Sequence, residues 1–201
     1  MPPPPPDAAA LSVADLAELG AVFEAHWDRL VAIARRRLDD RLAAGTDPED
    51  VVSQAFLDAR RKWVAFRARR PVSEFVWLYG LVADRVVATW RAATRDRRDV
   101  LRNVPWPDRP SIDLGFRLVA AGAGPGTEAE RKEAADLMRQ AIARLKDADR
   151  DVIMLRGYDE LGFKEIGELL GVTENTATVR YVRALRRLKA EWHALAGRSR
   201  P

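Results

Sequence analysis

The sequence of 201 residues contains no cysteine and only two histidines, His26 and His193, which stand far apart in the chain. The absence of cysteine excludes disulfides, thiolate metal sites and thiol nucleophiles. No pair of carboxylates stands out beyond helix caps and surface positions, so general acid and base chemistry has no candidate residues. The sequence therefore predicts a protein that is not an enzyme, with no catalytic residues, no metal site and no cofactor.

Long apolar runs are also missing, and none reaches the length of a membrane span. The first residues, MPPPPPDAAA, lack the basic segment and apolar core of a signal peptide. We interpret residues 1–11 as a disordered, proline-rich N-terminus, and we expect a cytoplasmic protein with no membrane insertion.

The apolar and polar residues nowhere alternate over a length that would predict a half-buried strand. Apolar residues instead recur at helical spacing, and 47% of the chain is hydrophobic, which is enough for a core. Ser12 with Asp15 is typical of a capping box, and Asp47 followed by Pro48 is typical of a helix start. Leu16 and Leu19 begin the predicted apolar stripe of the first helix. The sequence thus predicts an all-α fold.

Residues 103–126 are rich in proline and glycine and poor in helical periodicity, which is typical of a flexible linker. They divide the chain into two predicted small helical domains, 12–102 and 127–196. In the first domain we expect helices after Asp47 and after Ser73, the latter running on to about Val100. In the second, helices are predicted from Thr127 and from Leu145.

The segment FKEIGELLGVTENTATVRYV predicts a helix-turn-helix: a short helix from Phe163 to Leu170, a left-handed Gly171, and a second helix capped by Thr173. Small residues, Gly167 and Ala177, are expected where the two helices approach closely.

The helical period of 100° per residue sorts the second helix into two faces. The predicted core side contains Ala177, Tyr181, Ala184, Leu185 and Leu188. The opposite face contains Asn175, Val179, Val182, Arg183 and Arg186, with Thr176 at its edge and Arg180 and Arg187 at its flank. A solvated charged face would explain the arginines but not the valines. A helix in the DNA major groove explains both, because arginine binds phosphate or guanine and aliphatic groups contact thymine methyls. The net charge of +4 suits an anionic partner.

The segment DRDVIMLRGYDELGFKEIGELLGVTENTATVRYVRALRRLK resembles region 4 of the extracytoplasmic-function (ECF) group of sigma-70 factors. DPEDVVSQAFLDARRKW followed by FVWLYGLVADRVVATWR resembles region 2. The resemblance implies that 12–102 is sigma region 2, which binds core RNA polymerase and the −10 element, and that 127–196 is sigma region 4, which binds the −35 element. The partners it implies are the polymerase core, through the β′ clamp helices and the β subunit, and promoter DNA, with an anti-sigma factor as a further candidate.

By this resemblance the −35 contacts include Thr176, Thr178, Val179, Arg180, Arg183 and Arg187. Since Arg180 and Arg187 lie at the flank of the face, we expect them to contact phosphates. Together with the exposed face, the predicted −35 set is Asn175, Thr176, Thr178, Val179, Arg180, Val182, Arg183, Arg186 and Arg187.

The resemblance also assigns a loop around FRARRPVSEF to the flipped base of the −10 element and the helix after Asp47 to the β′ clamp helices. The predicted −10 set is Arg67, Arg69, Arg70, Ser73, Asp84, Arg91 and Arg95. Asp84 replaces the asparagine common in the family, and a carboxylate only accepts hydrogen bonds. The predicted polymerase contacts are Asp50, Ser53, Gln54 and Asp58; the family usually has Gln then Glu at the positions of Ser53 and Gln54.

Three other interpretations remain open at this point. An autonomous helix-turn-helix regulator would need a dimer interface or an effector pocket, and neither is evident. An enzyme would need catalytic residues, and a degenerate sigma-like protein would bind polymerase or an anti-sigma partner without recognising promoters.

Overall fold

The computed structural model describes residues 11–38, 46–93 and 128–197. The predicted N-terminal segment 1–11 falls almost wholly outside these ranges, as do the predicted linker 103–126 and Arg95. Within the described ranges the chain forms seven helices and no strand, which confirms the all-α prediction. The chain divides into two compact units, residues 1–104 and 105–201, and each is described by itself.

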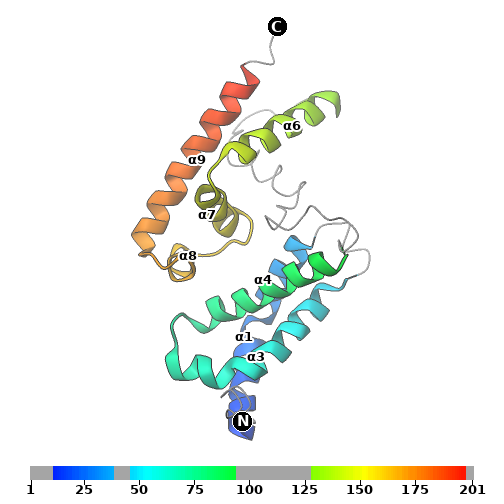
Figure 1. Ribbon diagram of the computed structural model, residues 1–201, viewed down its shortest axis with the longest axis vertical. Helices are drawn as coiled ribbons and strands as arrows, with labels where there is room; N and C mark the ends of the chain where they lie inside the picture. The colour runs from blue at the N-terminus through cyan, green and yellow to red at the C-terminus, as the bar shows by residue number, and fades with distance from the viewer. Residues whose placement is uncertain (1–10, 39–45, 94–127, 198–201) are drawn as a thin grey trace, which may run out of the picture. The chain divides into compact units, whose positions relative to one another are not determined.

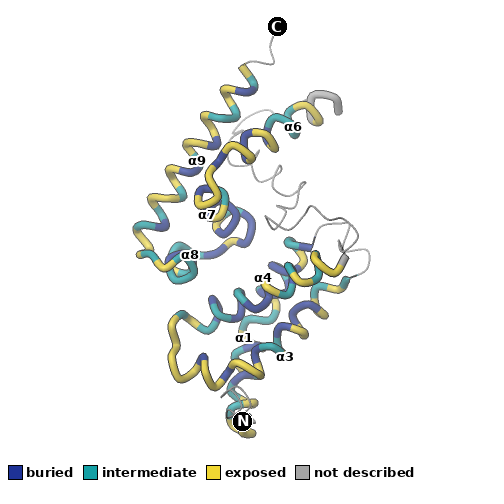
Figure 2. Tube along the Cα trace, viewed as in Figure 1, coloured by how far each residue is buried: buried dark blue, intermediate teal, exposed yellow. Residues whose placement is uncertain are grey.

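The N-terminal unit contains α1 (Val13–Arg37), α3 (Pro48–Arg69) and α4 (Glu74–Ala93), and each of these helices packs against the other two (Figure 1). Each helix buries one side and exposes the other (Figure 2). The largest fully buried side chains of this unit are Leu19, Leu30, Ile33, Trp63, Leu78, Val52, Val82 and Val86. Leu16, which was predicted on the apolar stripe of α1, is instead 39% exposed, because it lies in the first turn of α1, before the core begins at Leu19.

The predicted caps of this unit are confirmed. The Ser12 hydroxyl accepts from the backbone N–H of Asp15 at 3.0 Å, and the Asp15 carboxylate accepts from the backbone N–H of Ser12 at 3.2 Å. Asp47 caps α3 by accepting from the backbone N–H of Glu49 at 2.9 Å, with Pro48 in the first turn. Each cap satisfies amide groups that have no partner inside the helix, so these sequence signals fix where α1 and α3 begin.

The C-terminal unit contains α6 (Glu128–Arg144), α7 (Asp147–Gly157), α8 (Phe163–Leu170) and α9 (Glu174–Ala196). The long α9 packs against the other three helices (Figure 1). The core of the C-terminal unit contains Met138, Val152, Leu161, Ile166, Ala177, Ala184 and Leu188, all fully buried. The helix predicted from Leu145 begins two residues later, because the backbone N–H of the buried Leu145 donates to the carbonyl of Ile142 in the last turn of α6.

Candidate nucleic-acid interface

The turn between α8 and α9 has the geometry predicted for a helix-turn-helix. Gly171 ends α8 in the left-handed region, with φ 65° and ψ 35°. The backbone N–H of Val172 donates to the carbonyl of Gly167 at 2.9 Å. A Cβ at position 167 would lie 2.7 Å from the carbonyl oxygen of Val172, so only glycine permits this close approach. The two glycines therefore fix the angle at which α9 leaves α8.

The first turn of α9 is held by threonines. The Thr173 hydroxyl accepts from the backbone N–H of Thr176 at 3.2 Å and lies 2.8 Å from the Thr176 hydroxyl. The Thr178 hydroxyl donates to the carbonyl of Glu174 at 3.0 Å. Thr176 and Thr178 are both half-buried. These two predicted DNA contacts already have local hydrogen bonds, so each offers DNA mainly its remaining hydroxyl capacity and its methyl group.

The predicted core side of α9 is confirmed. Ala177 and Ala184 are fully buried, and Tyr181 is half-buried. The Tyr181 ring packs against Phe163 at the start of α8, with ring centroids 5.6 Å apart, and burial raises the pKa of the Tyr181 phenol. The Arg156 guanidinium lies 5.0 Å from the Phe163 ring centroid and donates to the carbonyl of Leu161 at 3.0 Å. These contacts tie α9 to α7 and α8 without using any residue of its outer face.

The outer face of α9 is exposed, as the helical period predicts. Val179 and Val182 are 38% and 40% exposed, whereas most valines in the described ranges are buried or half-buried. The other exposed members of the predicted −35 set are Asn175, Arg180, Arg183, Arg186 and Arg187. In the part of the chain that the structure describes, Arg180, Arg183 and Arg186 form no ion pair. Their guanidinium groups and the two valines therefore share one open surface.

Arg187 differs from the other arginines of α9. Its Nη1 lies 2.5 Å from the Oδ2 of Asp149 in the first turn of α7. Asp149 is 8% exposed, so the ion pair sits at the edge of the core. The phosphate contact of Arg187 stays a prediction. In the structure this side chain also joins α9 to α7 through its ion pair with Asp149. No sequence pattern predicts this role for Asp149, because the pair depends on how α7 packs.

The junction of α3 and α4 carries four residues of the predicted −10 set, Arg67, Arg69, Arg70 and Ser73. The loop predicted around this junction is shorter than expected. Arg67 and Arg69 belong to the last turn of α3, and Arg70 is the C-cap in the left-handed region at φ 38°. The helix continues because Trp63 and Phe66 still pack into the core below it. Phe66 stacks on Trp77 of α4 with centroids 4.2 Å apart. Only residues 70–73 are left to connect α3 and α4.

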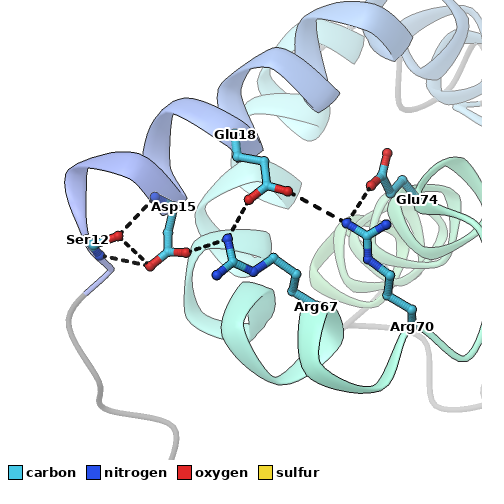
Figure 3. A network of polar contacts seen from close by, with 6 residues as sticks. All are labelled: Ser12, Asp15, Glu18, Arg67, Arg70 and Glu74. Atoms are coloured by element: carbon cyan, nitrogen blue, oxygen red, sulfur yellow. Dashed lines mark hydrogen bonds and ion pairs between the residues drawn. The ribbon is translucent and has the colours of Figure 1, made fainter.

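Two of these arginines are held by carboxylates of the same unit (Figure 3). Arg67 Nη1 lies 2.8 Å from Asp15 Oδ1 and 2.5 Å from Glu18 Oε2. Arg70 Nη2 lies 3.6 Å from Glu18 Oε1 and 3.4 Å from Glu74 Oε1. We call these five residues, Asp15, Glu18, Arg67, Arg70 and Glu74, the corner cluster. Sequence analysis identified Asp15 only as a cap and missed Glu18, although Glu18 follows one turn later on the same side of α1.

Contacts within the corner cluster, together with the cap at Ser12, shift the pKa values of Asp15 and Arg67. The pKa of the Asp15 carboxyl is lowered, first by the hydrogen bond from the Ser12 hydroxyl and then also by the charge of Arg67. The pKa of Arg67 is raised above its ordinary value, first by its hydrogen bond to Glu18 and then by the charges of Asp15 and Glu18. Both shifts favour the charged forms, so the Asp15 carboxylate and the Arg67 guanidinium are both charged at neutral pH.

The remaining described members of the −10 set lie along α4. Ser73 precedes the helix and is exposed, and its carbonyl accepts from the backbone N–H of Trp77 at 3.0 Å. Asp84 and Arg91 are also exposed. Trp77 is half-buried, and its ring stacks on Phe66.

The predicted polymerase contacts on α3 separate into two groups. Asp50, Ser53 and Gln54 are exposed. Asp58, predicted to point outward, is instead directed into the unit: its side chain is 16% exposed and pairs with Arg85 of α4 and with Arg61. The hydrogen bond and charge of Arg85 lower the pKa of the Asp58 carboxyl. Asp58 therefore joins α3 to α4, and its predicted outward position is wrong.

Two apolar residues of α3, which sequence analysis did not single out, share its exposed surface. Leu57 and Val64 are 42% and 44% exposed. They follow Ser53 and Gln54 at helical spacing, so one side of α3 combines small polar and apolar groups. Exposed large apolar residues on one helix face are typical of contact surfaces.

Neither a metal site nor a membrane span is found among the described residues. No group of three or more His, Cys, Asp or Glu residues within those ranges could hold a metal ion. No helix there is both long and apolar enough to cross a bilayer.

Comparison with known proteins relates both units to one family. The family described as "Sigma-70, region 4" matches residues 135–188, which contain most of α6, all of α7 and α8, and most of α9. The chain is 26% identical to the ECF RNA polymerase sigma factor SigW of Bacillus subtilis (strain 168) over 170 residues, which is 85% of this chain and 86% of SigW. It is 29% identical to the ECF RNA polymerase sigma factor SigD of Mycobacterium tuberculosis (strain ATCC 25618 / H37Rv) over 174 residues, covering 86% of this chain and 76% of SigD.

Proposed function

The chain belongs to the ECF group of the sigma-70 family, and on this premise we propose that it binds core RNA polymerase and directs promoter-specific initiation of transcription. The partners in this proposal are the polymerase core and promoter DNA. We assign no catalytic step to the chain itself, because its part is to position DNA on the polymerase.

The observation that carries the proposal is the outer face of α9. A capped helix presents arginines and two exposed valines together, and its opposite side is anchored by Tyr181 and by buried alanines. The major groove of DNA is wide enough for such a helix and displays acceptors, donors and thymine methyl groups. Arg183 lies on this face one turn after the exposed Val179, so we assign it a base or phosphate contact at the −35 element. Arg180 lies at the flank, where phosphate contact is expected.

The N-terminal unit supplies two further surfaces in this proposal. The junction of α3 and α4, with Arg67, Arg69 and Arg70, would meet the single-stranded −10 element. The exposed side of α3, with Asp50, Ser53 and Gln54 and with the apolar Leu57 and Val64, would dock on the β′ clamp helices. We omit Asp58 from the docking surface because Arg85 and Arg61 hold it. An anti-sigma factor is a further candidate partner.

The proposal divides the chain into region 2 over 12–102, a linker over 103–126 and region 4 over 127–196. The match to region 4 within the C-terminal unit supports the last assignment. The continuous similarity to SigW and SigD over most of the chain supports the order of the regions.

Run-off transcription with core polymerase on a promoter library tests the proposal. We expect promoter-specific transcripts that require both the chain and the core enzyme. DNA binding that is independent of core polymerase, with no promoter-specific transcript, would contradict the proposal and would favour an autonomous regulator. A chain that binds core polymerase without selecting any promoter would indicate a degenerate sigma-like protein.

The exposed valines give a sharper test of the same assignment. We expect Val179→Ala and Val182→Ala to change which promoters the library selects, because apolar side chains contact thymine methyls. The matched control is Val64→Ala, a similarly exposed valine on α3, which should leave promoter choice unchanged even if it weakens polymerase binding.

A further inference from the structure

The corner cluster places carboxylates beside Arg67 and Arg70, where the proposed function requires DNA phosphates to bind. Three carboxylates, from Asp15, Glu18 and Glu74, face two guanidinium groups, so the cluster carries a net negative charge. A surface with this charge repels a nucleic-acid backbone. In these pairs Arg67 uses only Nη1 and Arg70 only Nη2, so each guanidinium keeps other N–H donors, but the carboxylates offset the positive charge that would attract a phosphate.

The geometry identifies the partner that resembles a phosphate. Glu18 places Oε2 on Arg67 and Oε1 on Arg70, so one carboxylate bridges the last turn of α3 and its C-cap. A DNA phosphodiester also has two unesterified oxygens that accept charged hydrogen bonds from arginine. In Figure 3 the Glu18 side chain lies between the two guanidinium groups. It occupies the position from which a phosphate would bridge the same pair.

The other two carboxylates match a displaceable, bridging phosphate less well. Asp15 is only 15% exposed, and its carboxylate is also fixed by the hydroxyl and the backbone N–H of Ser12. Glu74, the first residue of α4, pairs within the described residues with Arg70 alone, at 3.4 Å, so it does not bridge the two guanidinium groups. Glu18 is 40% exposed and its partners are 43% and 55% exposed. Ion pairs this open to water contribute little to stability and are readily exchanged.

We infer that Glu18 of α1 is an internal substitute for a DNA phosphate, which holds Arg67 and Arg70 until single-stranded DNA displaces it. This inference rests on the proposed function, because it concerns the junction of α3 and α4 that would meet the −10 element. It adds that α1, which has no predicted DNA contact, sets how strongly that junction binds DNA.

The test uses polymerase holoenzyme assembled from core enzyme and the full chain. The probe is a promoter fragment selected from the library, with its −10 element left single-stranded on the non-template strand. Glu18→Gln keeps the shape of the side chain but removes the charge, and we expect it to raise the affinity for this probe about threefold, since two weak ion pairs no longer compete. A matched control, Glu24→Gln, removes an exposed charge of the same helix that lies outside the corner cluster, and it should change the affinity by much less.

A second pair of variants separates release of the arginines from a general charge effect. In an Arg67→Ala, Arg70→Ala background, Glu18→Gln should have no greater effect than Glu24→Gln, because the groups that Glu18 holds are gone. An unchanged affinity for Glu18→Gln would overturn the inference, as would an equal effect in the double-alanine background. Weaker binding by Glu18→Gln would also overturn it and would mean that Glu18 orients the arginines for DNA.

These outcomes are distinct from failure of the proposed function. If the unmodified chain gives no promoter-specific transcript with core polymerase, the proposed function fails whatever Glu18 does. If it gives such transcripts and Glu18→Gln behaves like Glu24→Gln, only the inference about Glu18 fails.

Discussion

Two groups of arginines were predicted to meet DNA, and the structure surrounds them differently. On α9, Arg180, Arg183 and Arg186 stand on an exposed face, and within the described residues no carboxylate pairs with them. In the corner cluster, Arg67 and Arg70 are bound to carboxylates of α1 and α4. The difference shows that a basic sequence motif predicts charge but not its availability, because availability depends on which helix packs beside it.

The two surfaces also differ in how they are positioned. The face of α9 is oriented by a tight turn, in which Gly167 approaches the backbone of Val172 and Gly171 adopts a left-handed conformation. The corner cluster is oriented by ion pairs, which are open to water and sensitive to salt. Substitutions that act on one surface should therefore leave the other unchanged.

We expect the largest effect for Gly167→Ala, which should disturb the orientation of α9 and leave the corner cluster unchanged. The added Cβ would lie 2.7 Å from the Val172 carbonyl oxygen and 3.2 Å from the Glu174 nitrogen, both backbone atoms. We expect a loss of about 2–3 kcal/mol in the free energy of unfolding of the C-terminal unit. Hydrogen exchange should increase in peptides of α8 and α9 and stay unchanged in α3. Gly80→Ala, with nothing within 4 Å of the new Cβ, is the control; equal protection in both variants would contradict the role of the turn.

The next prediction compares Arg183, which no carboxylate binds within the described residues, with Arg67, which pairs with Asp15 and Glu18. Arg183→Ala should lower the affinity of holoenzyme for promoter DNA about tenfold, because within the described residues no carboxylate pairs with this side chain and the substitution would remove its proposed DNA contact. Arg67→Ala should lower it only about twofold, because displacing Glu18 would offset part of the gain from the proposed phosphate contact. Filter binding or fluorescence anisotropy on the same promoter measures both. Equal losses would mean that the corner cluster does not restrain Arg67.

Arg187 and its neighbour Arg186 form a matched pair within α9. Arg187→Ala should lower the free energy of unfolding of the C-terminal unit by about 1 kcal/mol, since Asp149, 8% exposed, loses its charged partner. Arg186→Ala, on the open face, should leave stability unchanged and weaken promoter binding instead. Thermal denaturation and promoter affinity of the two variants give the comparison. A stable Arg187→Ala variant with strongly reduced affinity would assign Arg187 to DNA after all.

The smallest effect is a pH dependence in the N-terminal unit. Arg85 lowers the pKa of Asp58 below its ordinary 3.8, so this ion pair stabilises the folded unit above that pH. The contribution is lost as the pH falls through the lower pKa of the folded state. Asp58→Asn should be less stable than the unmodified chain by about 0.5–1 kcal/mol near neutral pH, and the difference should shrink as the pH falls below the ordinary 3.8. Melting temperatures measured across this range test the sign; a difference that grows in acid would contradict it.

Much of the fold was predictable from the sequence because the signals are local. Ser12, Asp47, Gly171 and Thr173 act on backbone groups within a few residues, so their roles as caps and turn residues follow from spacing alone. The face of α9 was also predictable, since the helical period places Ala177 and Ala184 opposite Val179 and Val182 whatever the rest of the chain does.

The candidate site was predictable only where it lies on a single helix. The sequence could not reveal that Asp58 turns toward Arg85, that Asp149 meets Arg187, or that Glu18 bridges Arg67 and Arg70. Each of these pairs joins helices that are far apart in sequence. Leu57 and Val64 were also missed, because only the packing of α1 and α4 decides which side of α3 remains uncovered.

By itself, the sequence determined that this chain is helical, where most of its helices begin, and that α9 carries valines and arginines on one face. These properties depend on hydrogen bonds and periodicities that span a few residues. The tertiary structure decided which charged groups are free to meet a partner. Electrostatic pairing depends on distances in space, and side chains from α1, α3 and α4 reach one another only after these helices have packed around a common core.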